Sequence, residues 1–285
     1  MSDGTPASAP PVITTIAALR ERFPARAVAL VPTMGALHEG HLALVRRAAE
    51  LADEVVVSIF VNPLQFGPSE DLDRYPRDLE ADLALLAPLG VAAVFAPAVD
   101  EMYPDGPPQT TLRAGELGGR LEGRTRPGHF DGMLTVVAKL IHIARPAHLL
   151  FGQKDAQQVF LVERMVRDLD LEAHVEVVET VRAADGLALS SRNRYLDESE
   201  RRAALALSRA LEAADSAADR GIDAVIAAAQ SVLMGEEHVE VDYFEVVDPA
   251  TFLPVGDDFR GTARVLIAAR VGPARLIDND AIYLN

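Results

Sequence analysis

The chain has 285 residues, enough for one large domain or two ordinary ones, and its hydrophobic fraction of 49% argues against global disorder. Its formal net charge is −16. Such an acidic chain is a poor partner for nucleic acid, whose phosphates bind basic surfaces, but a small anionic substrate remains open where cations gather locally. It contains no cysteine, which excludes disulfides, thiol chemistry and thiolate metal sites and makes the cytoplasm the default location, and no apolar run reaches the ~18–20 residues of a membrane helix.

Residues 1–12 are rich in proline, serine and alanine. They lack the basic and then apolar pattern of a signal peptide. We therefore expect a disordered tail here, followed by a folded domain over residues 13–182.

That first domain alternates strands with helices. The strands are continuous apolar runs, and the helices carry apolar residues on one face. Repeated units of this kind predict a parallel sheet with helices on both faces, and hence an α/β, Rossmann-like domain. In chain order we expect strand 25–33, helix 40–52, strand 53–63, a helix from after Pro76 to Gly90, strand 91–98, helix 131–144, strand 147–152, helix 155–169 and strand 172–181.

Residues 183–285 have a different pattern. An alanine-rich helical segment over 200–235 precedes three alternating strands separated by turns, at 239–247, 263–272 and 274–284. This order predicts a smaller α+β domain with an antiparallel sheet, in the position of a lid.

Four polar clusters follow the predicted strands of the first domain. Ligands of parallel sheets bind beyond the carboxyl ends of the strands, so we expect these clusters to converge on one active site. They are TMGALHEGH (33–41), NPLQFG (62–67), FGQKDAQQ (151–158) and SSRN (190–193).

The histidines His38 and His41 lie between a strand and a helix, with Gly35 and Gly40 beside them. A zinc-binding helix would place two histidines four residues apart and add a third ligand, and neither feature is present. A second interpretation is a pair of surface histidines at a helix start. The third is a phosphate site, in which glycines allow close backbone approach, helix N-terminal amides attract the anion and imidazoles donate hydrogen bonds.

Only two of the 27 basic residues are lysines, Lys139 and Lys154. Lys139 lies in an apolar helical stretch. Its position there is explained if its aliphatic stem covers apolar surface while the ammonium group reaches solvent. Lys154 lies in a strand-to-helix loop, where its ammonium group is suited to phosphate. A solvated loop lysine is the alternative.

The motif VPTMGALHEGH resembles the H-x-G-H signature of the nucleotidylyltransferase superfamily. With SIFVNPLQFG, DLDRYPR, RPGHFDGMLTVVAKL, FGQKDAQQ and DGLALSSRNRYL, the chain resembles the pantoate–β-alanine ligase family from about Val28 to the C-terminal RLIDN. The resemblance implies an ATP-dependent condensation of pantoate with β-alanine through a pantoyl adenylate, releasing pyrophosphate and AMP. It also implies that Mg²⁺ accompanies the ATP and that the protein forms a homodimer. No membrane or nucleic acid partner is expected.

The resemblance also implies residue roles. His41 is the expected proton donor, with His38, Lys154 and Arg192 completing the catalytic set. The ATP-binding positions are Met34, Gly35, Ala36, Leu37, His38, Glu39, Gly40, His41, Gly152, Gln153, Lys154, Asp155, Val181, Leu189, Ser190, Ser191 and Arg192. Gln153 departs from the family's F-G-E-K-D, so any role of that carboxylate is in doubt. Asp155 is also suited to capping the following helix, and Val181 to ordinary strand core.

Three further residues concern the other substrate and the metal ion. Gln65 and Gln158 match the glutamines that hold pantoate, with a plain turn residue and an exposed helix residue as their alternatives. Asp82 aligns with an acidic position near the magnesium, although its acid-rich helix favours a solvated face.

Arg126 lies in GELGGRLEGRTRPGHFDG, a segment with three arginines in an acidic protein. This concentration of cations suggests that Arg126 faces the anionic substrates and that part of the segment orders over them. A floppy surface loop is the alternative.

Two other functions share part of this pattern. A plain nucleotidylyltransferase would share H-x-G-H but not the glutamine pair or the SSRN segment, and a non-catalytic nucleotide sensor would not need His38, His41 and Lys154 intact.

Overall fold

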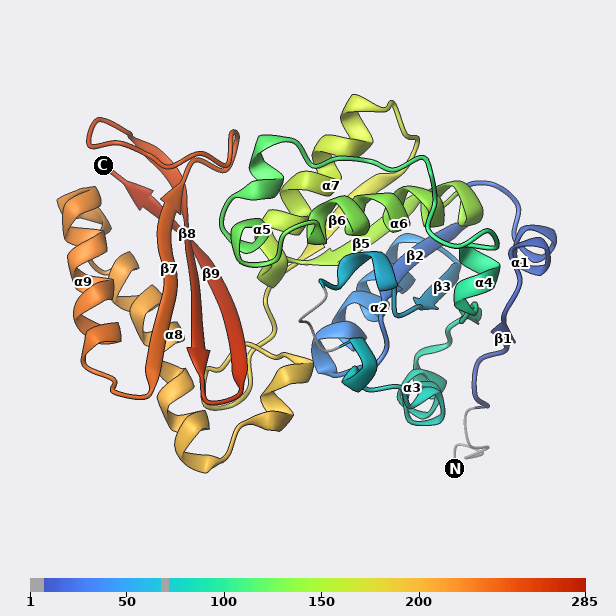
Figure 1. Ribbon diagram of the computed structural model, residues 1–285, viewed down its shortest axis with the longest axis horizontal. Coiled ribbons are helices and arrows are strands. Elements are labelled where there is room, and N and C mark those ends of the chain that lie inside the picture. The colour runs from blue at the N-terminus through green and yellow to red at the C-terminus, as the bar shows by residue number, and fades with distance from the viewer. Residues whose placement is uncertain (1–7, 68–71) are drawn as a thin grey trace. The chain divides into compact units, whose positions relative to one another are not determined.

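A computed structural model describes residues 8–67 and 72–285. The chain divides into two compact units (Figure 1). The first comprises residues 1–152 and 161–178, and the second comprises 153–160 and 179–285. The predicted boundary at residue 182 lies close to this division, whereas the contacts also assign 153–160 to the second unit.

The first unit is built on a parallel sheet, as predicted. Its strand order is β1-β4-β3-β2-β5-β6, and every pair in it is parallel. The last five strands follow the order of doubly wound sheets, in which the direction of winding reverses between β2 and β5. The strands are β1 (Val12–Ile13), β2 (Val28–Thr33), β3 (Glu54–Ile59), β4 (Ala93–Phe95), β5 (His148–Gly152) and β6 (His174–Val178).

Helices cover both faces of this sheet. On one face, Ala29 and Val31 of β2 share an apolar cluster with Leu42 and Val45 of the helix that follows. Alternate residues of a strand point to the opposite face, where α6 contacts β2 and α1. The helices are α1 (Ile16–Arg22), α2 (Glu39–Leu51), α3 (Leu79–Leu86), α4 (Val99–Met102), α5 (Glu122–Thr125), α6 (His129–Ala144) and α7 (Ala156–Asp168).

Local sequence explains where the third helix begins and ends. Asp78 is its N-cap, and its carboxylate accepts the N–H of Ala81 at 3.0 Å. After the short 3₁₀ turn Ala87–Leu89, Gly90 takes a left-handed conformation with φ +66° and ends the helical path. The late start after Pro76 and the stop at Gly90 are therefore confirmed.

The N-terminal prediction needs a correction. Residues 1–7 of the expected tail lie outside the described residues. The tail does not extend to residue 12, because Val94 N–H donates to the Pro11 carbonyl and Val12 pairs with β4. Helix α1 follows directly, with Thr15 as its N-cap.

The second unit holds an antiparallel sheet of order β7-β8-β9, as predicted. Its strands are β7 (Val239–Val247), β8 (Gly261–Val271) and β9 (Ala274–Leu284), and its helices are α8 (Glu198–Asp215) and α9 (Ile222–Met234). The alanine-rich face of α8 and the apolar face of α9 share one core with the sheet, in which Ala210, Val225 and Val265 are fully buried. Small side chains let the helices approach the strands closely.

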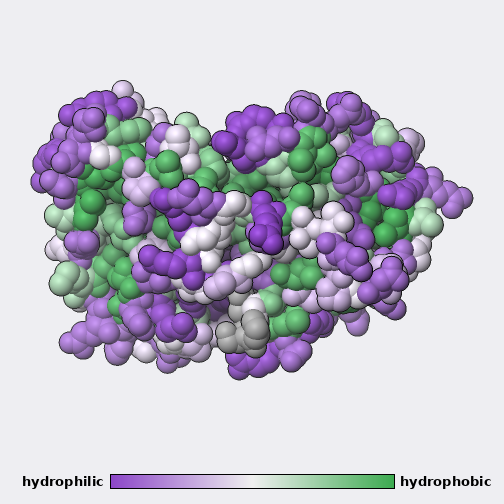
Figure 2. Space-filling view, turned by 45° about the horizontal axis from the view of Figure 1, so that its top comes forward, coloured by the Kyte–Doolittle hydropathy of each residue, from purple (hydrophilic) through white to green (hydrophobic). Residues whose placement is uncertain are grey.

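The surface agrees with the acidic composition. On the face in Figure 2, polar residues cover much of the area and apolar residues are interspersed among them. Within residues 8–67 and 72–285, no helix is both long and apolar enough to cross a membrane.

Candidate active site

The turn after β2 is shaped by two consecutive residues with positive φ, Gly35 at +80° and Ala36 at +52°. This backbone points the N–H groups of Ala36 and Leu37 at the carboxylate of Asp82, at 3.0 and 2.7 Å. A Cβ on Gly35 would lie 2.9 Å from Asp82 Oδ2, so both the φ angle and the close approach require glycine. The turn is therefore built around a carboxylate from α3.

The expectation that Asp82 lies on a solvated face is wrong. Asp82 is only 3% exposed, although Glu80 on the same helix faces solvent. Both oxygens accept backbone N–H groups, and these hydrogen bonds help to stabilise the buried carboxylate. Sequence context gave no sign of this, because the partners lie 45 and 46 residues away.

We expect Asp82→Ala to lower the unfolding free energy by about 2–3 kcal/mol, since it leaves two buried N–H groups without their charged acceptor. The distorted turn should also bind ATP more weakly. Thermal unfolding and calorimetric titration with ATP measure the two effects. Glu80→Ala is the matched control, because Glu80 is an exposed acid on the same helix. An Asp82→Ala protein with unchanged melting temperature and ATP affinity would contradict this account.

The histidine pair forms a capping box at the start of α2. Gly40 N–H donates to Nδ1 of His38 at 3.2 Å, and His38 N–H donates to Nδ1 of His41 at 3.2 Å. The two rings lie with their centroids 4.1 Å apart. Gly40 is needed for this packing, because a Cβ there would lie 2.9 Å from the His38 ring.

These contacts fix the tautomers of the neutral rings. A backbone N–H only donates, so each Nδ1 accepts and each proton is on Nε2. Both rings are half-buried. The backbone contacts at the start of α2 set the direction in which each Nε2–H points. The sequence predicted that amides at this helix N-terminus attract a phosphate. Two of these amides already have partners, because Gly40 N–H donates to the His38 imidazole and His41 N–H donates to the His38 carbonyl.

A cavity of about 250 Å³ adjoins this turn. Its walls come from the segments that follow β2, β3 and β4, together with the start of α3. Met34, Phe60 and Val99 are among its apolar lining residues, and Asp82 and Arg77 are among its polar ones. It therefore lies at the carboxyl ends of the strands, as predicted for a ligand site in this kind of sheet.

Gln65 is buried at 7% exposure in the 3₁₀ turn η1 (Pro63–Gln65). Its side-chain oxygen accepts from Asn62 Nδ2 at 2.9 Å, and the same nitrogen donates to the Gly132 carbonyl at 3.1 Å. Asn62 Oδ1 accepts the hydroxyl of Tyr103 at 2.9 Å, and burial raises the pKa of that tyrosine. Gln65 is thus set by a buried network rather than being a plain turn residue.

The main-chain carbonyl of Gln65 is held by two further side chains. His129 Nδ1 donates to it at 2.9 Å, and Arg126 Nη2 at 3.5 Å. Arg126 Nη1 also lies 3.1 Å from His129 Nε2 and, being only a donor, makes that nitrogen the acceptor. Arg126 is half-buried and ordered beside Gln65, so the alternative of a floppy loop is wrong for this residue.

Asn62 and His129 were missed as candidates. Both are buried polar residues within the motifs NPLQFG and RPGHFDG, one next to Gln65 in its turn and the other next to Arg126. A buried polar side chain needs hydrogen-bond partners. The signal that could have identified His129 was its position close to the candidate Arg126 in the sequence.

Most of the remaining candidates belong to the second unit. Lys154 lies in the 3₁₀ turn η5 (Gln153–Asp155), and its Nζ donates to the Leu189 carbonyl at 3.1 Å. It is therefore not a solvated loop lysine. Gln158, on the first turn of α7, is half-buried rather than exposed.

The segment from Val181 to Arg192 forms a compact turn in this unit. Leu189 N–H donates to the Val181 carbonyl at 2.9 Å, and Ser190 Oγ accepts from Arg192 N–H at 3.3 Å at the start of η6 (Ser191–Tyr195). Val181 lies beyond β6, which ends at Val178, so the alternative of strand core is wrong. Lys154 and Leu189, 35 residues apart in the chain, are thus in contact.

The structure brings the candidates together in two groups. The turn 34–41, Asp82, Gln65 and Arg126 belong to the first unit, as does Gly152, and the other candidates belong to the second. Convergence of both groups on one ligand stays a prediction. In the described part of the chain, no group of three histidines or acids is placed to hold a metal ion.

Comparison with known proteins identifies the family of the chain. The family model described as pantoate-beta-alanine ligase matches residues 11–281. The pantothenate synthetase of Leifsonia xyli subsp. xyli is 59% identical over 271 residues, covering 95% of this chain and 94% of the relative.

Solved structures show the same fold. The pantothenate synthetase of Thermus thermophilus superposes with a TM-score of 0.92 at 48% identity, covering 96% of this chain and 99% of that one. The pantoate-beta-alanine ligase of Francisella tularensis, complexed with beta-gamma ATP and beta-alanine, gives 0.78 at 34% identity, covering 95% and 97%. By its sequence and its fold alike, the chain belongs to the pantoate–β-alanine ligase family.

Proposed function

We propose that the chain condenses pantoate with β-alanine in two steps that use ATP. The pantoate carboxylate attacks the α-phosphorus, giving pantoyl adenylate and releasing pyrophosphate. The amine of β-alanine then attacks the acyl carbon, giving pantothenate and releasing AMP. The protein's task is to position the reactants and stabilise developing charge, because phosphoryl and acyl transfer of this kind need no covalent enzyme intermediate.

The observation that carries this proposal is the capping box of His38 and His41. Each Nδ1 accepts a backbone N–H, which puts the proton of each neutral ring on Nε2 and fixes the direction of that N–H. Donors of fixed direction stabilise charge that grows on phosphoryl oxygens in the transition state. His41 is the proton donor in our proposal, with His38, Lys154 and Arg192 around the phosphates.

For the other substrate, we assign pantoate to Gln65 and Gln158. Amide groups both donate and accept, which suits a molecule with two hydroxyls and a carboxylate. The buried network around Gln65 supports this assignment, since it holds the amide in one orientation. The cavity lined by Met34, Phe60 and Val99 has apolar walls that suit the dimethyl carbon of pantoate.

Magnesium enters this proposal as part of the ATP substrate. Both oxygens of Asp82 already accept backbone N–H groups, which explains that carboxylate without a metal ion. We therefore derive no step through a protein-bound metal. Homodimer formation and a cytoplasmic location stay predictions from the resemblance and from the composition.

Product analysis tests the function. Mass spectrometry of a reaction with ATP, pantoate and β-alanine should find pantothenate, AMP and pyrophosphate as separate products. A product that retains the nucleotide would identify a plain nucleotidylyltransferase. A folded protein without pantoate-dependent exchange between ATP and labelled pyrophosphate would identify a nucleotide sensor.

We expect Arg126→Ala to raise the KM for pantoate about 10-fold, the scale of one charge-assisted hydrogen bond. The reason is that Arg126 helps to hold the Gln65 carbonyl and places a cation beside that glutamine. Steady-state kinetics with each substrate varied in turn measures this effect. Arg120→Ala is the matched control, because Arg120 is an exposed arginine of the same segment that pairs with Glu116. Unchanged KM for pantoate and ATP with unchanged turnover would refute the role.

A further inference from the structure

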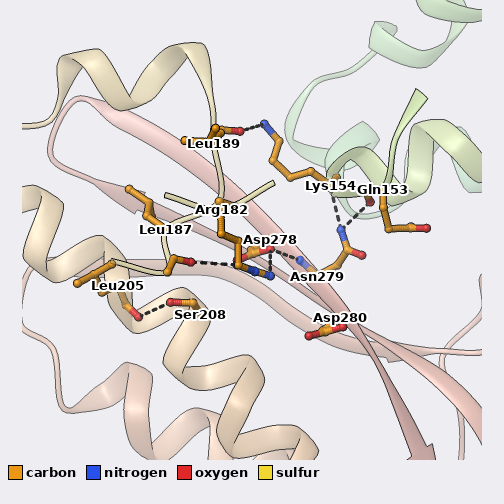
Figure 3. Close-up of polar contacts among 12 residues, drawn as sticks. Gln153, Lys154, Arg182, Leu187, Leu189, Leu205, Ser208, Asp278, Asn279 and Asp280 are labelled. Carbon is orange, nitrogen blue, oxygen red and sulfur yellow. Dashed lines mark hydrogen bonds and ion pairs between the residues drawn. The ribbon is translucent and has the colours of Figure 1, made fainter. Parts of the chain in front are cut away.

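Asn279, on β9, connects the C-terminal strand to the turn that carries Lys154 (Figure 3). Its side chain is 3% exposed and has a partner for each polar atom. Nδ2 donates to the carbonyls of Gln153 at 2.9 Å and Lys154 at 2.8 Å, and Oδ1 accepts from Arg264 at 2.7 Å. One amide thus fixes two consecutive carbonyls of η5.

The neighbouring residue Asp278 fixes the chain segment that leads to Leu189. Arg182 donates to both of its oxygens, at 2.6 and 3.0 Å, and also to the Gly186 carbonyl at 3.2 Å. Burial raises the pKa of the Asp278 carboxyl, an effect that the Arg182 guanidinium partly offsets. The ion pair therefore fixes the turn that leads to Leu189.

These two anchors meet at Lys154. Its backbone is held by Asn279, and its ammonium group donates to the carbonyl of Leu189 at 3.1 Å. A free lysine side chain samples many rotamers, with roughly 2 kcal/mol of conformational entropy. Fixing its backbone and offering one acceptor for Nζ restricts those rotamers, so the direction of the cation depends on β9.

We propose that Asn279 is a positioning residue, which acts on ATP activation by orienting Lys154 through η5, with Asp278 fixing the Leu189 side. The inference depends on the proposed role of Lys154 at the phosphates. It gives a function to RLIDN, the C-terminal motif of the resemblance. The two-step reaction by itself does not require this motif. Asn279 itself has no contact with substrate in this assignment.

The test is a double-mutant cycle between Asn279 and Lys154 in the full chain. The readout is pantoate-dependent exchange between ATP and labelled pyrophosphate, which reports the first step alone. Asn279→Ala should slow the exchange by about 10–100-fold, the effect of a misplaced catalytic group, and leave the KM for pantoate unchanged. Lys154→Ala should slow it by about 10²–10³-fold. In the Lys154→Ala background, Asn279→Ala should have no further effect, because a positioning residue has nothing left to position.

Asp242→Asn is the matched control. It breaks a short ion pair with Arg275 that joins β7 to β9 without reaching η5, so it should leave the exchange rate unchanged. If Asn279→Ala does not fold, Asn279→Asp replaces it in the cycle, since it keeps the side-chain size and the Arg264 contact while losing both donors.

The outcomes separate the two proposals. Full exchange in Lys154→Ala would overturn the role of Lys154 and leave no basis for positioning. Loss in Lys154→Ala together with full exchange in the Asn279 variant would overturn the positioning role alone. So would an Asn279 effect of the same size in both backgrounds, because that result indicates a structural contribution.

Discussion

Replacing His41 by asparagine should lower turnover by about 10²–10³-fold, the scale expected when one transition-state donor is removed. The amide oxygen of asparagine reaches roughly where Nδ1 lies, so it still accepts the N–H of His38 and keeps the cap of α2. The Nε2–H donor, in contrast, is lost. Measuring kcat by release of pyrophosphate, with the melting temperature recorded in parallel, separates catalysis from folding.

His41→Gln supplies the complementary control. Its longer amide reaches toward the position of Nε2, so it should recover part of the turnover while weakening the helix cap. If His41→Asn retained full turnover, or if the loss followed the melting temperature across both variants, the imidazole would be a structural cap and not a proton donor.

Gly132→Ala should destabilise the first unit severely, with a loss of about 3 kcal/mol or more of unfolding free energy. A Cβ at this position would lie 2.0 Å from the Leu64 carbonyl oxygen and 2.4 Å from its carbon. Both atoms are backbone, so no side-chain rotation relieves the overlap and α6 has to move away from η1. That movement breaks the bond from Asn62 to the Gly132 carbonyl and releases Gln65.

Chemical denaturation measures this loss, and the KM for pantoate should rise in whatever folded protein remains. Gly119→Ala is the control, because Gly119 is exposed and a Cβ there meets no atom within 4 Å. Equal stability of the two alanine variants would show that α6 and η1 are not in the close contact described above.

The sequence predicted the parts of the fold that have a strong periodicity. Buried runs such as 53–63 and 91–98 indicated the strands β3 and β4, although both strands are shorter than the runs. The short elements β1, α1, α4 and α5 were not predicted. β1 has only two residues, and its stability comes from pairing with β4 some 80 residues later, which no local pattern records.

The candidate site also has features that the local sequence predicted and features that it did not. His38, His41, Lys154 and Gln65 were recognisable from motifs, because chemistry restricts which residue types occur there. Several contacts that hold the site were not, since they join residues far apart in the chain: Asp82 with the turn at 35–37, His129 with Gln65 and Asn279 with Lys154. The motifs thus identified the candidate groups, and the contacts that orient them are visible only in the fold.

The turn after β2 contains two successive residues of left-handed backbone, Gly35 and Ala36. Two successive left-handed residues make a small concave nest of N–H groups, a shape that elsewhere binds phosphate or another external anion. Here an internal anion, Asp82, already fills it. In the function proposed above, the negative charge of Asp82 keeps a triphosphate out of this nest and directs it toward the two imidazoles. A buried acid on a neighbouring helix would then influence the path of the phosphate chain.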